Sequence, residues 1–404
     1  MPPFELGRRP LLAGAAAALA ASRARGADSV DLGLPGRPAT RQLTTAFPQK
    51  GRMILQRGMA PLLETPFSVF DQGVFTPNDA FYVRWHWGVF PTAIDADTFR
   101  LTVRGKVARP QSLSLSDLVR GLPQVELAAV NQCSGNSRGF VQPAVPGAQW
   151  SNGAMGNALW RGVRLKDVLD RAGVQPGAVA VRFTGLDEAA LPDSPRFHKS
   201  LSLDHARDGD VMIATGMNGA DLPLLNGFPA RLVVPGWYAT YWLKMLSDIE
   251  VLGAADDNYW MATAYRIPDT PDGGIAPGSK GFPTRPIGAM VPRSFFTNPP
   301  GPGAVAAGAP LALRGIAFGG DRGVAQVDIS TDDGAQWRPA SLGPDQGRFG
   351  FRRWSATITP VRGRNVVAVR CTNSAGLAQP VHSVWNPGGY MRNGIEQITL
   401  EAAA

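Results

Sequence analysis

Cysteine and histidine are scarce in this chain. Its 404 residues include two cysteines, Cys133 and Cys371, and four histidines. A tetrahedral zinc site needs several such ligands close together, and the sequence clusters them nowhere. The haem-attachment motif Cys-x-x-Cys-His is also absent. Two cysteines exclude a disulfide-rich scaffold but leave a single Cys133–Cys371 disulfide open in an oxidising compartment.

The chain also lacks long hydrophobic runs and clustered charge. No internal stretch reaches the roughly 18 uncharged apolar residues that cross a bilayer, so we expect no membrane span. The net charge is +8, but the basic residues form no continuous run and are not interleaved with aromatic ones. This distribution argues against nucleic acid as a partner and favours a small anionic substrate or an acidic protein.

A pair of arginines near the N-terminus is the first specific signal. Arg8 and Arg9 precede a short, alanine-rich apolar run from Leu11 to Ala21. This pattern is typical of a twin-arginine export signal, although an ordinary secretory signal has the same general form. Because the twin-arginine route carries folded proteins, we expect residues 1–29 to direct export of the folded protein to the periplasm.

Two domains are expected after this signal. Residues 30–291 mix short helices and strands without regular alternation, which favours an α+β domain over a doubly wound sheet. Residues 30–75 show few regular patterns and are predicted to form an arm around the folded body. Further predictions for this domain are a strand from 81 to 87, helices at 115–122 and 165–172, and strands at 125–130, 179–184 and 231–234.

The last part of the chain, residues 292–404, changes character. Pro299 to Gly303 is typical of a linker, and apolar strands are predicted beyond it at 311–316, 326–330, 354–358 and 366–371. Their spacing is typical of a β-sandwich. Cys371 is in phase with Val367 and Val369, which indicates a small core residue and not a reactive thiol.

Cys133 has a different local sequence. It follows a predicted strand, lies among small residues and is close to Arg138, as a partly exposed thiol with a cationic neighbour would be. Such a thiol suits either a nucleophile or a soft metal. A single thiolate without other protein ligands nearby implies that a metal's remaining ligands come from a cofactor.

The residues around Cys133 resemble the cysteine loop of the sulfite oxidase family of molybdoenzymes. The segment is Asn131-Gln132-Cys133-Ser134-Gly135-Asn136-Ser137-Arg138-Gly139. Further matching segments follow in the family's order: Tyr82 to His86, Trp150 to Trp160, Phe183 to Asp187, Asn226 to Arg231, Val234 to Gly236, Trp242 to Lys244 and Trp385 to Tyr390. Bacterial sulfite dehydrogenase catalytic subunits are the part of the family that the chain resembles most.

This resemblance implies a molybdopterin-binding domain, an immunoglobulin-like second domain and oxidation of sulfite to sulfate. It implies that Cys133 binds molybdenum and that the catalytic pocket contains Arg84, His86, Arg138, Trp150 and Tyr265. The residues implied to hold the pterin are Tyr82, Val83, Arg84, Trp85, His86, Asp187, Asn226, Arg231, Trp242, Leu243 and Lys244. Guanidinium groups suit an anionic substrate, and a phosphate tail suits a paired arginine and lysine. Without a haem motif in the chain, a c-type cytochrome, as a subunit or a soluble acceptor, is the expected electron acceptor.

Two departures from the family and two other functions have to be weighed. Asn226 stands where animal members have histidine, and Gly388 stands where they have a pocket arginine, which puts the third anion contact in doubt.

Taken singly, each of the following residues also has an ordinary structural interpretation. Arg84 is typical of a surface charge, His86 of a core histidine, Asp187 of a turn and Tyr265 of packing. The alternatives to sulfite oxidation are reduction of a sulfoxide or nitrate on the same cofactor and a cofactor-free, disulfide-bonded anion-binding protein.

Overall fold

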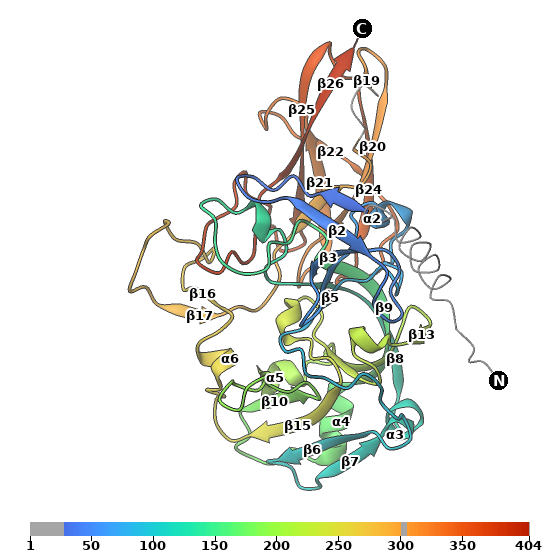
Figure 1. Ribbon diagram of the computed structural model, residues 1–404, viewed down its shortest axis with the longest axis vertical. Coiled ribbons are helices and arrows are strands. Elements are labelled where there is room, and N and C mark those ends of the chain that lie inside the picture. Colours follow the sequence, from blue (N-terminus) through green and yellow to red (C-terminus); the bar gives the residue numbers. More distant parts are fainter. Residues whose placement is uncertain (1–27, 300–304, 404) are drawn as a thin grey trace, which may run out of the picture.

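The computed structural model describes residues 28–299 and 305–403, and strands dominate it. The predicted export signal and most of the predicted linker lie outside these ranges. Figure 1 shows the C-terminal strands at one end of the molecule, the N-terminal strands beside them and the remaining sheets at the other end. Within the described ranges no helix is long and apolar enough to cross a bilayer.

The first sheet is built by the N-terminal residues. Its strands pair in chain order, all antiparallel: β1 (Ser29–Asp31), β2 (Thr40–Thr44), β3 (Met53–Arg57), β4 (Leu62–Glu64) and β5 (Val83–Arg84). The prediction of an irregular arm over residues 30–75 is therefore wrong, because β1 to β4 and the short helix α2 (Val69–Gln72) form there. The strand expected from 81 to 87 is also shorter than predicted, because only β5 pairs.

Two further sheets complete the first domain. One has the order β11 (His198–Ser202), β10 (Ala180–Gly185), β15 (Leu246–Leu252), β6 (Arg100–Gly105) and β7 (Gln111–Ser114), and only β15 and β6 are parallel. The other has the order β13 (Ala220–Asp221), β12 (Met212–Met217), β9 (Met155–Arg164) and β8 (Gln124–Gln132), with β14 (Arg231–Val233) also paired to β12. The hairpin of β16 (Arg266–Pro268) and β17 (Thr284–Pro286) projects from this domain.

The predicted helices form where local sequence favours them. Ser114 caps α3 (Leu115–Arg120) through a reciprocal capping box with Asp117. In α4 (Leu165–Ala172) the buried residues recur at helical spacing, and Gly173 ends it with φ of +71°. The other helices, α5 (Leu203–Ala206) and α6 (Tyr259–Ala262), are single turns. Helices are thus short and accompany the sheets without alternating with strands.

The second domain consists of two sheets. One has the order β18 (Arg293–Phe296), β20 (Leu311–Phe318), β24 (Arg352–Ile358) and β23 (Ser341–Leu342). The other has the order β19 (Val305–Ala306), β26 (Glu396–Ala403), β25 (Gly363–Asn373), β21 (Val324–Ser330) and β22 (Arg338–Pro339). Residues from both sheets share one buried cluster, which includes Leu313, Trp354, Val369 and Cys371. The predicted core position of Cys371 is confirmed, and burial raises the pKa of its thiol far above the usual range.

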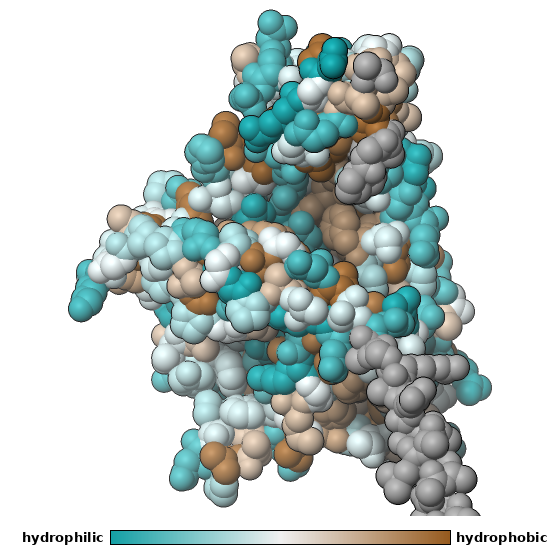
Figure 2. All heavy atoms as spheres, turned by 45° about the horizontal axis from the view of Figure 1, so that its top comes forward, coloured by the Kyte–Doolittle hydropathy of each residue, from teal (hydrophilic) through white to brown (hydrophobic). Residues whose placement is uncertain are grey.

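The two domains pack closely. The largest apolar cluster extends from the first domain to Phe295, Ile316, Phe318, Phe349 and Phe351 of the second. Polar contacts cross the same boundary, since Asp71 of α2 pairs with Arg314 of β20 at 2.8 Å. Elsewhere the surface is mixed: on the face in Figure 2, hydrophobic residues are mostly interspersed with polar ones.

Candidate active site

Cys133 lies at the junction of two cavities. The strands β8 and β9 pair over nine residues, and the Cys133 amide extends that ladder by donating to Ala154 O at 3.0 Å. The loop then turns back through Ser137, whose φ is +67°. Asn136 holds the turn: its Oδ1 accepts from Ala154 N at 3.0 Å and its Nδ2 donates to Gln132 Oε1 at 3.2 Å. The Cys133 thiol therefore lies on a loop whose conformation is fixed by the hydrogen bonds of Asn136 to Ala154 and Gln132.

The first cavity collects all of the residues predicted to hold the pterin. Its walls include Tyr82, Val83, Arg84, Trp85, His86, Asp187, Asn226, Arg231, Trp242, Leu243 and Lys244, together with Cys133, Asn131, Phe197, Thr240 and Tyr265. These residues come from β5, β8, β14 and the turns near residues 187, 226 and 242. The fold thus brings together segments that are far apart in the sequence.

The second cavity, of about 450 Å³, collects four of the five predicted catalytic residues. Arg84, Arg138, Trp150 and Tyr265 line it together with Cys133, Arg57, Ser134, Gly388 and Tyr390, among others. His86 lines only the first cavity, but its Nε2 lies 2.6 Å from the Tyr265 hydroxyl.

Polar atoms without partners lie along both cavities. Among the described residues, Arg84 Nη1, Asn131 Nδ2, Ser134 Oγ, Arg231 Nε and Thr240 Oγ1 are buried and make no hydrogen bond. All five residues line one cavity or both. Leaving such atoms unpaired costs about 1–3 kcal/mol each, so they favour a polar ligand that pairs with them. This donor-rich lining fits the phosphate-bearing pterin group expected from the sequence.

Arg231 and Lys244 are the buried cations of the first cavity. The Arg231 guanidinium lies 4.9 Å from the Trp160 ring centroid and donates to the carbonyls of Asn226 and Trp242. Lys244 Nζ donates to Arg84 O at 2.8 Å. Burial lowers the pKa of Arg231 to about 10 and that of Lys244 to about 7. An anionic ligand such as a phosphate tail would favour the charged forms of both groups and raise their pKa values again.

Asn226 lines the first cavity, and two hydrogen bonds fix its side chain. Its Oδ1 accepts from the buried Lys50 Nζ at 2.5 Å, and its Nδ2 donates to Tyr82 O at 3.1 Å. Lys50 also donates to the carbonyls of Asn78 and Phe81. Asn226 therefore braces the Tyr82 segment, and since each of its amide atoms can make one more hydrogen bond, the predicted contact with the pterin stays a prediction.

His86 and Tyr265 form the neutral part of the site. Burial, and then the charge of Arg84, lowers the pKa of His86 well below its usual range, so the ring is uncharged at neutral pH. Phe197 stacks on it with ring centroids 3.7 Å apart. Burial raises the pKa of Tyr265 above its usual range, which keeps the hydroxyl protonated. Tyr265 has a backbone φ of +56°, and this strained geometry is typical of a residue held for function.

Arg138 is fixed by backbone carbonyls. Its Nε donates to Gly388 O at 2.9 Å and its Nη1 to Ala148 O at 3.1 Å. Gly135 and Gly147 leave room for the guanidinium, since a Cβ at either would lie within 3.0 Å of it. Neither of these two hydrogen bonds uses Nη2 of Arg138. Arg138 lines the second cavity.

Sequence reasoning missed two residues of the second cavity. Arg57 lies at the end of β3, within the segment expected to be an irregular arm, and no motif marks it. Tyr390 belongs to a recognised segment but received no role. The alternative disulfide is excluded, because Cys133 and Cys371 are both free and belong to different buried clusters. Among the described residues no three His, Cys, Asp or Glu side chains gather as a metal site, so a metal at Cys133 needs outside ligands.

Comparison with known proteins gives consistent matches along the chain. Residues 87–260 match the oxidoreductase molybdopterin binding domain, and residues 288–402 match the Mo-co oxidoreductase dimerisation domain. The sulfite oxidase of Arabidopsis thaliana is 30% identical over 368 residues, which cover 83% of this chain and 91% of that protein. The mitochondrial sulfite oxidase of Drosophila melanogaster is 32% identical over 379 residues, or 88% of this chain, but the match spans only 64% of that longer protein.

A solved structure has the same fold. The sulfane dehydrogenase SoxCD from Paracoccus pantotrophus superimposes with a TM-score of 0.73 over 89% of this chain and 88% of that one, at 24% identity. At that identity the likeness concerns the fold alone.

Proposed function

Because the chain belongs to the sulfite oxidase family and has that family's molybdenum-pterin cofactor, we propose that it oxidises sulfite to sulfate and passes the electrons to a c-type cytochrome. The observation that carries this proposal is the position of Cys133 between the cavity that gathers the predicted pterin residues and a cavity containing Arg84 and Arg138. The absence of a haem-attachment motif in the sequence supports a separate electron acceptor.

The protein's part in the reaction is to bind and orient. Sulfite and water give sulfate, two protons and two electrons; the molybdenum-pterin group supplies the oxygen transfer and accepts the electrons. Arg84 and Arg138 hold the oxyanion by charge-assisted hydrogen bonds. Trp150, which is 1% exposed, excludes water from the same cavity and so strengthens those bonds.

The Tyr265–His86 pair provides an uncharged donor to the cavity. The Tyr265 hydroxyl can donate to the anion, and it adds no charge to the arginines there. His86 Nε2 lies 2.6 Å away on an uncharged ring; as the Nε2–H tautomer it would donate to the Tyr265 oxygen and leave the hydroxyl proton directed into the cavity. Cys133, Arg84, Arg138, Trp150, Tyr265 and His86 keep in this proposal the roles expected from the sequence.

The C-terminal sandwich is proposed to be of the immunoglobulin-like type. Its strands β18, β20, β24 and β23 follow the order A-B-E-D, and β22, β21, β25 and β26 follow C′-C-F-G of such domains. We keep the domain boundaries at residues 29/30 and 291/292 as part of this proposal. Folded export to the periplasm through Arg8 and Arg9 is proposed as well and concerns residues outside the described ranges.

The test is sulfite-dependent reduction of cytochrome c by the molybdenum-loaded protein. We expect activity in the parent, its near-complete loss in Cys133→Ser, and retention in Cys371→Ser, which alters only a core thiol. A parent that reduces nitrate or a sulfoxide but leaves sulfite untouched would favour the reductase alternative. Full activity in Cys133→Ser would refute the ligand assignment.

A further inference from the structure

Tyr390 brings a side chain of the second domain into the proposed anion cavity. Its ring stacks on Tyr265 with centroids 5.7 Å apart and an interplanar angle of 17°. The Arg138 guanidinium carbon lies 5.2 Å from the centroid of the same ring. Tyr390 and Cys133 line one cavity with Arg84 and Arg138. The ring is therefore in contact with two groups that the proposed mechanism uses, although it lies in a different domain.

The segment that carries Tyr390 is held rigidly. Asn386 brackets it from both sides, since Oδ1 accepts from Tyr390 N at 3.0 Å and Nδ2 donates to Tyr390 O at 2.9 Å. The next amide, Met391 N, donates to Ser134 O at 3.0 Å, beside Cys133. Both hydrogen bonds of Tyr390 to these neighbours are made by its backbone, which leaves the hydroxyl available. Its place is thus fixed relative to the cysteine loop.

Gly388 leaves the space that Tyr390 fills. A Cβ at Gly388 would lie 2.4 Å from Cε2 and 2.5 Å from Cδ2 of the Tyr390 ring. Any side chain at position 388 would therefore displace that ring. An arginine at position 388 and the present position of the Tyr390 ring would exclude each other.

We propose that the Tyr390 hydroxyl supplies a further, uncharged polar contact to the anion, beside Arg84, Arg138 and Tyr265; this inference rests on the proposed function. Burial raises the pKa of Tyr390, so the hydroxyl stays protonated and can donate a hydrogen bond. A phenol adds a hydrogen bond to the anion without adding to the positive charge that the arginines of the cavity already supply. The phenol thereby sets how tightly sulfite, and the product sulfate, are held.

The first experiment compares Tyr390→Phe with Tyr259→Phe in the molybdenum-loaded protein. Tyr390→Phe keeps the stacked ring and removes only the hydroxyl. We expect the KM for sulfite to rise about fivefold to tenfold with kcat changed less than twofold, and the dissociation constant of sulfate, measured by calorimetry, to rise by a similar factor. Tyr259, which is 46% exposed and lines neither cavity, provides the same chemical change as a control and should alter none of these values.

A second variant tests the position of the ring. Gly388→Ala retains the hydroxyls of Tyr265 and Tyr390 but displaces the Tyr390 ring. It should therefore also weaken sulfate binding. The inference fails if Tyr390→Phe binds sulfate and sulfite as the parent does. If the parent does not oxidise sulfite but Tyr390→Phe still weakens sulfate binding, the proposed function fails while the anion contact stands.

Discussion

Arg84 occupies the point where the two cavities meet. Its carbonyl accepts from Lys244, its Nη1 is buried without a partner among the described residues, and its guanidinium carbon lies 5.9 Å from the Tyr265 ring. One charge-assisted hydrogen bond to an anion contributes about 1.5–3 kcal/mol. We therefore expect Arg84→Gln to raise the KM for sulfite roughly tenfold to a hundredfold in steady-state assays.

Arg57 offers a matched control for that change. It lines the second cavity but is exposed, and its Nε donates to Ala60 O at 3.1 Å. Arg57→Gln should lower the rate of sulfite capture at low salt, because an exposed charge acts mainly by long-range attraction, and this effect should vanish at high salt. Equal effects of the two substitutions at high salt would contradict the assignment of Arg84 as a direct contact.

Lys199 is a buried lysine whose main role is structural. It is fully buried, its Nζ donates to Trp260 O at 2.6 Å and lies 4.5 Å from the Tyr241 ring centroid, and burial lowers its pKa from 10.5 to about 7. Between pH 7 and 10.5 the unfolded chain therefore binds a proton that the folded protein does not. The Lys199 contribution to stability must rise with pH through this window, by at most about 1.4 kcal/mol per pH unit.

The substitution Lys199→Met should make the free energy of unfolding depend less on pH between pH 7 and 10.5. Chemical denaturation at several pH values measures the effect, and the variant should gain stability relative to the parent as pH falls from 10 to 7. Lys166→Met is a suitable control, because Lys166 is exposed and pairs only with Asp170 on α4. A difference between Lys199→Met and the parent that does not vary with pH would contradict the lowered pKa.

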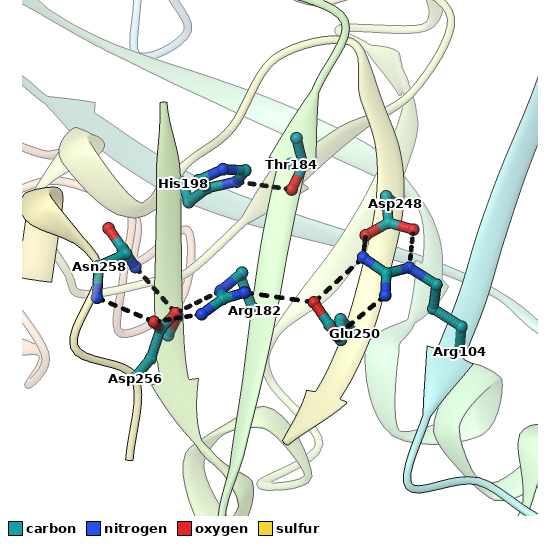
Figure 3. Close-up of polar contacts among 9 residues, drawn as sticks. Arg104, Arg182, Thr184, His198, Asp248, Glu250, Asp256 and Asn258 are labelled. Carbon is teal, nitrogen blue, oxygen red and sulfur yellow. Dashed lines mark hydrogen bonds and ion pairs between the residues drawn. The ribbon is translucent and has the colours of Figure 1, made fainter. Parts of the chain in front are cut away.

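Among the elements, the sheet of β6, β15 and β10 is crossed by a chain of ion pairs. Figure 3 shows Arg104 between Asp248 and Glu250, and Arg182 between Glu250 and Asp256. Asp256 also accepts from the amide of Asn258, the residue that caps α6. Since α6 leads to Tyr265, the ion pairs anchor one end of the segment that carries the catalytic tyrosine.

Asp256→Asn should weaken this anchor. The Asp256 side chain is 1% exposed, and its hydrogen bonds from Arg182 and Ser200 hold its pKa below the usual 3.8 in spite of burial. Its contribution is therefore fully present above about pH 4 and is lost as the pH falls further. We expect a loss of about 1–3 kcal/mol at pH 7 by denaturant titration, shrinking in acid.

Asp248→Asn is the matched control for the same sheet. Its partner Arg104 is 48% exposed, and an exposed pair contributes less than about 1 kcal/mol. If both substitutions have equal and small effects, Asp256 does not anchor α6.

Elements with local signals were predictable from the sequence. The helix α4 and the strand β8 were expected within one or two residues, because α4 has apolar residues at helical spacing and β8 contains the apolar run Leu127–Val130 shortly before the cysteine loop. In contrast, β4 is buried on both faces and even contains the buried Glu64, so it shows no alternation. The alternating aromatic residues from 81 to 87 led to the prediction of a strand that is too long. These side chains are buried because they line the cavity, and not because the whole segment pairs as a strand.

The site was predictable only as far as its motifs reach. The ordered segments marked Cys133, Arg138 and the cofactor residues, since each lies in a short recognisable stretch. Arg57 lies outside every such stretch, and the contact between Tyr390 and Tyr265 joins two domains. Only the folded chain reveals such contacts.

At the scale of the whole molecule, the second domain supports the cysteine loop. Arg293 of β18 is 1% exposed, donates to Ser137 Oγ at 2.9 Å and pairs with Glu396 of β26 at 2.7 Å. Removing one partner of a buried pair is strongly destabilising, although Arg392 still pairs with Glu396. We expect Arg293→Met to cost about 3 kcal/mol of stability and to lower the molybdenum content of the purified protein.

The control for Arg293 is Arg314→Met at the same domain boundary. Arg314 is 47% exposed in its pair with Asp71, so its loss should cost less than about 1 kcal/mol and leave the metal content unchanged. Thermal unfolding measures the stability of both variants, and metal analysis measures their molybdenum content. Normal metal content in Arg293→Met would show that the loop does not depend on the second domain.

The contacts of Arg293 and Met391 with the loop around Cys133 also impose an order in time. A ribosome completes Cys133 long before it reaches either residue, and Glu396 emerges among the last. A growing chain therefore displays the thiol before the groups that hold its loop exist. Full support of the loop that binds the metal group therefore comes only with the final strand, and a chain without that strand should hold the group less firmly than the whole protein.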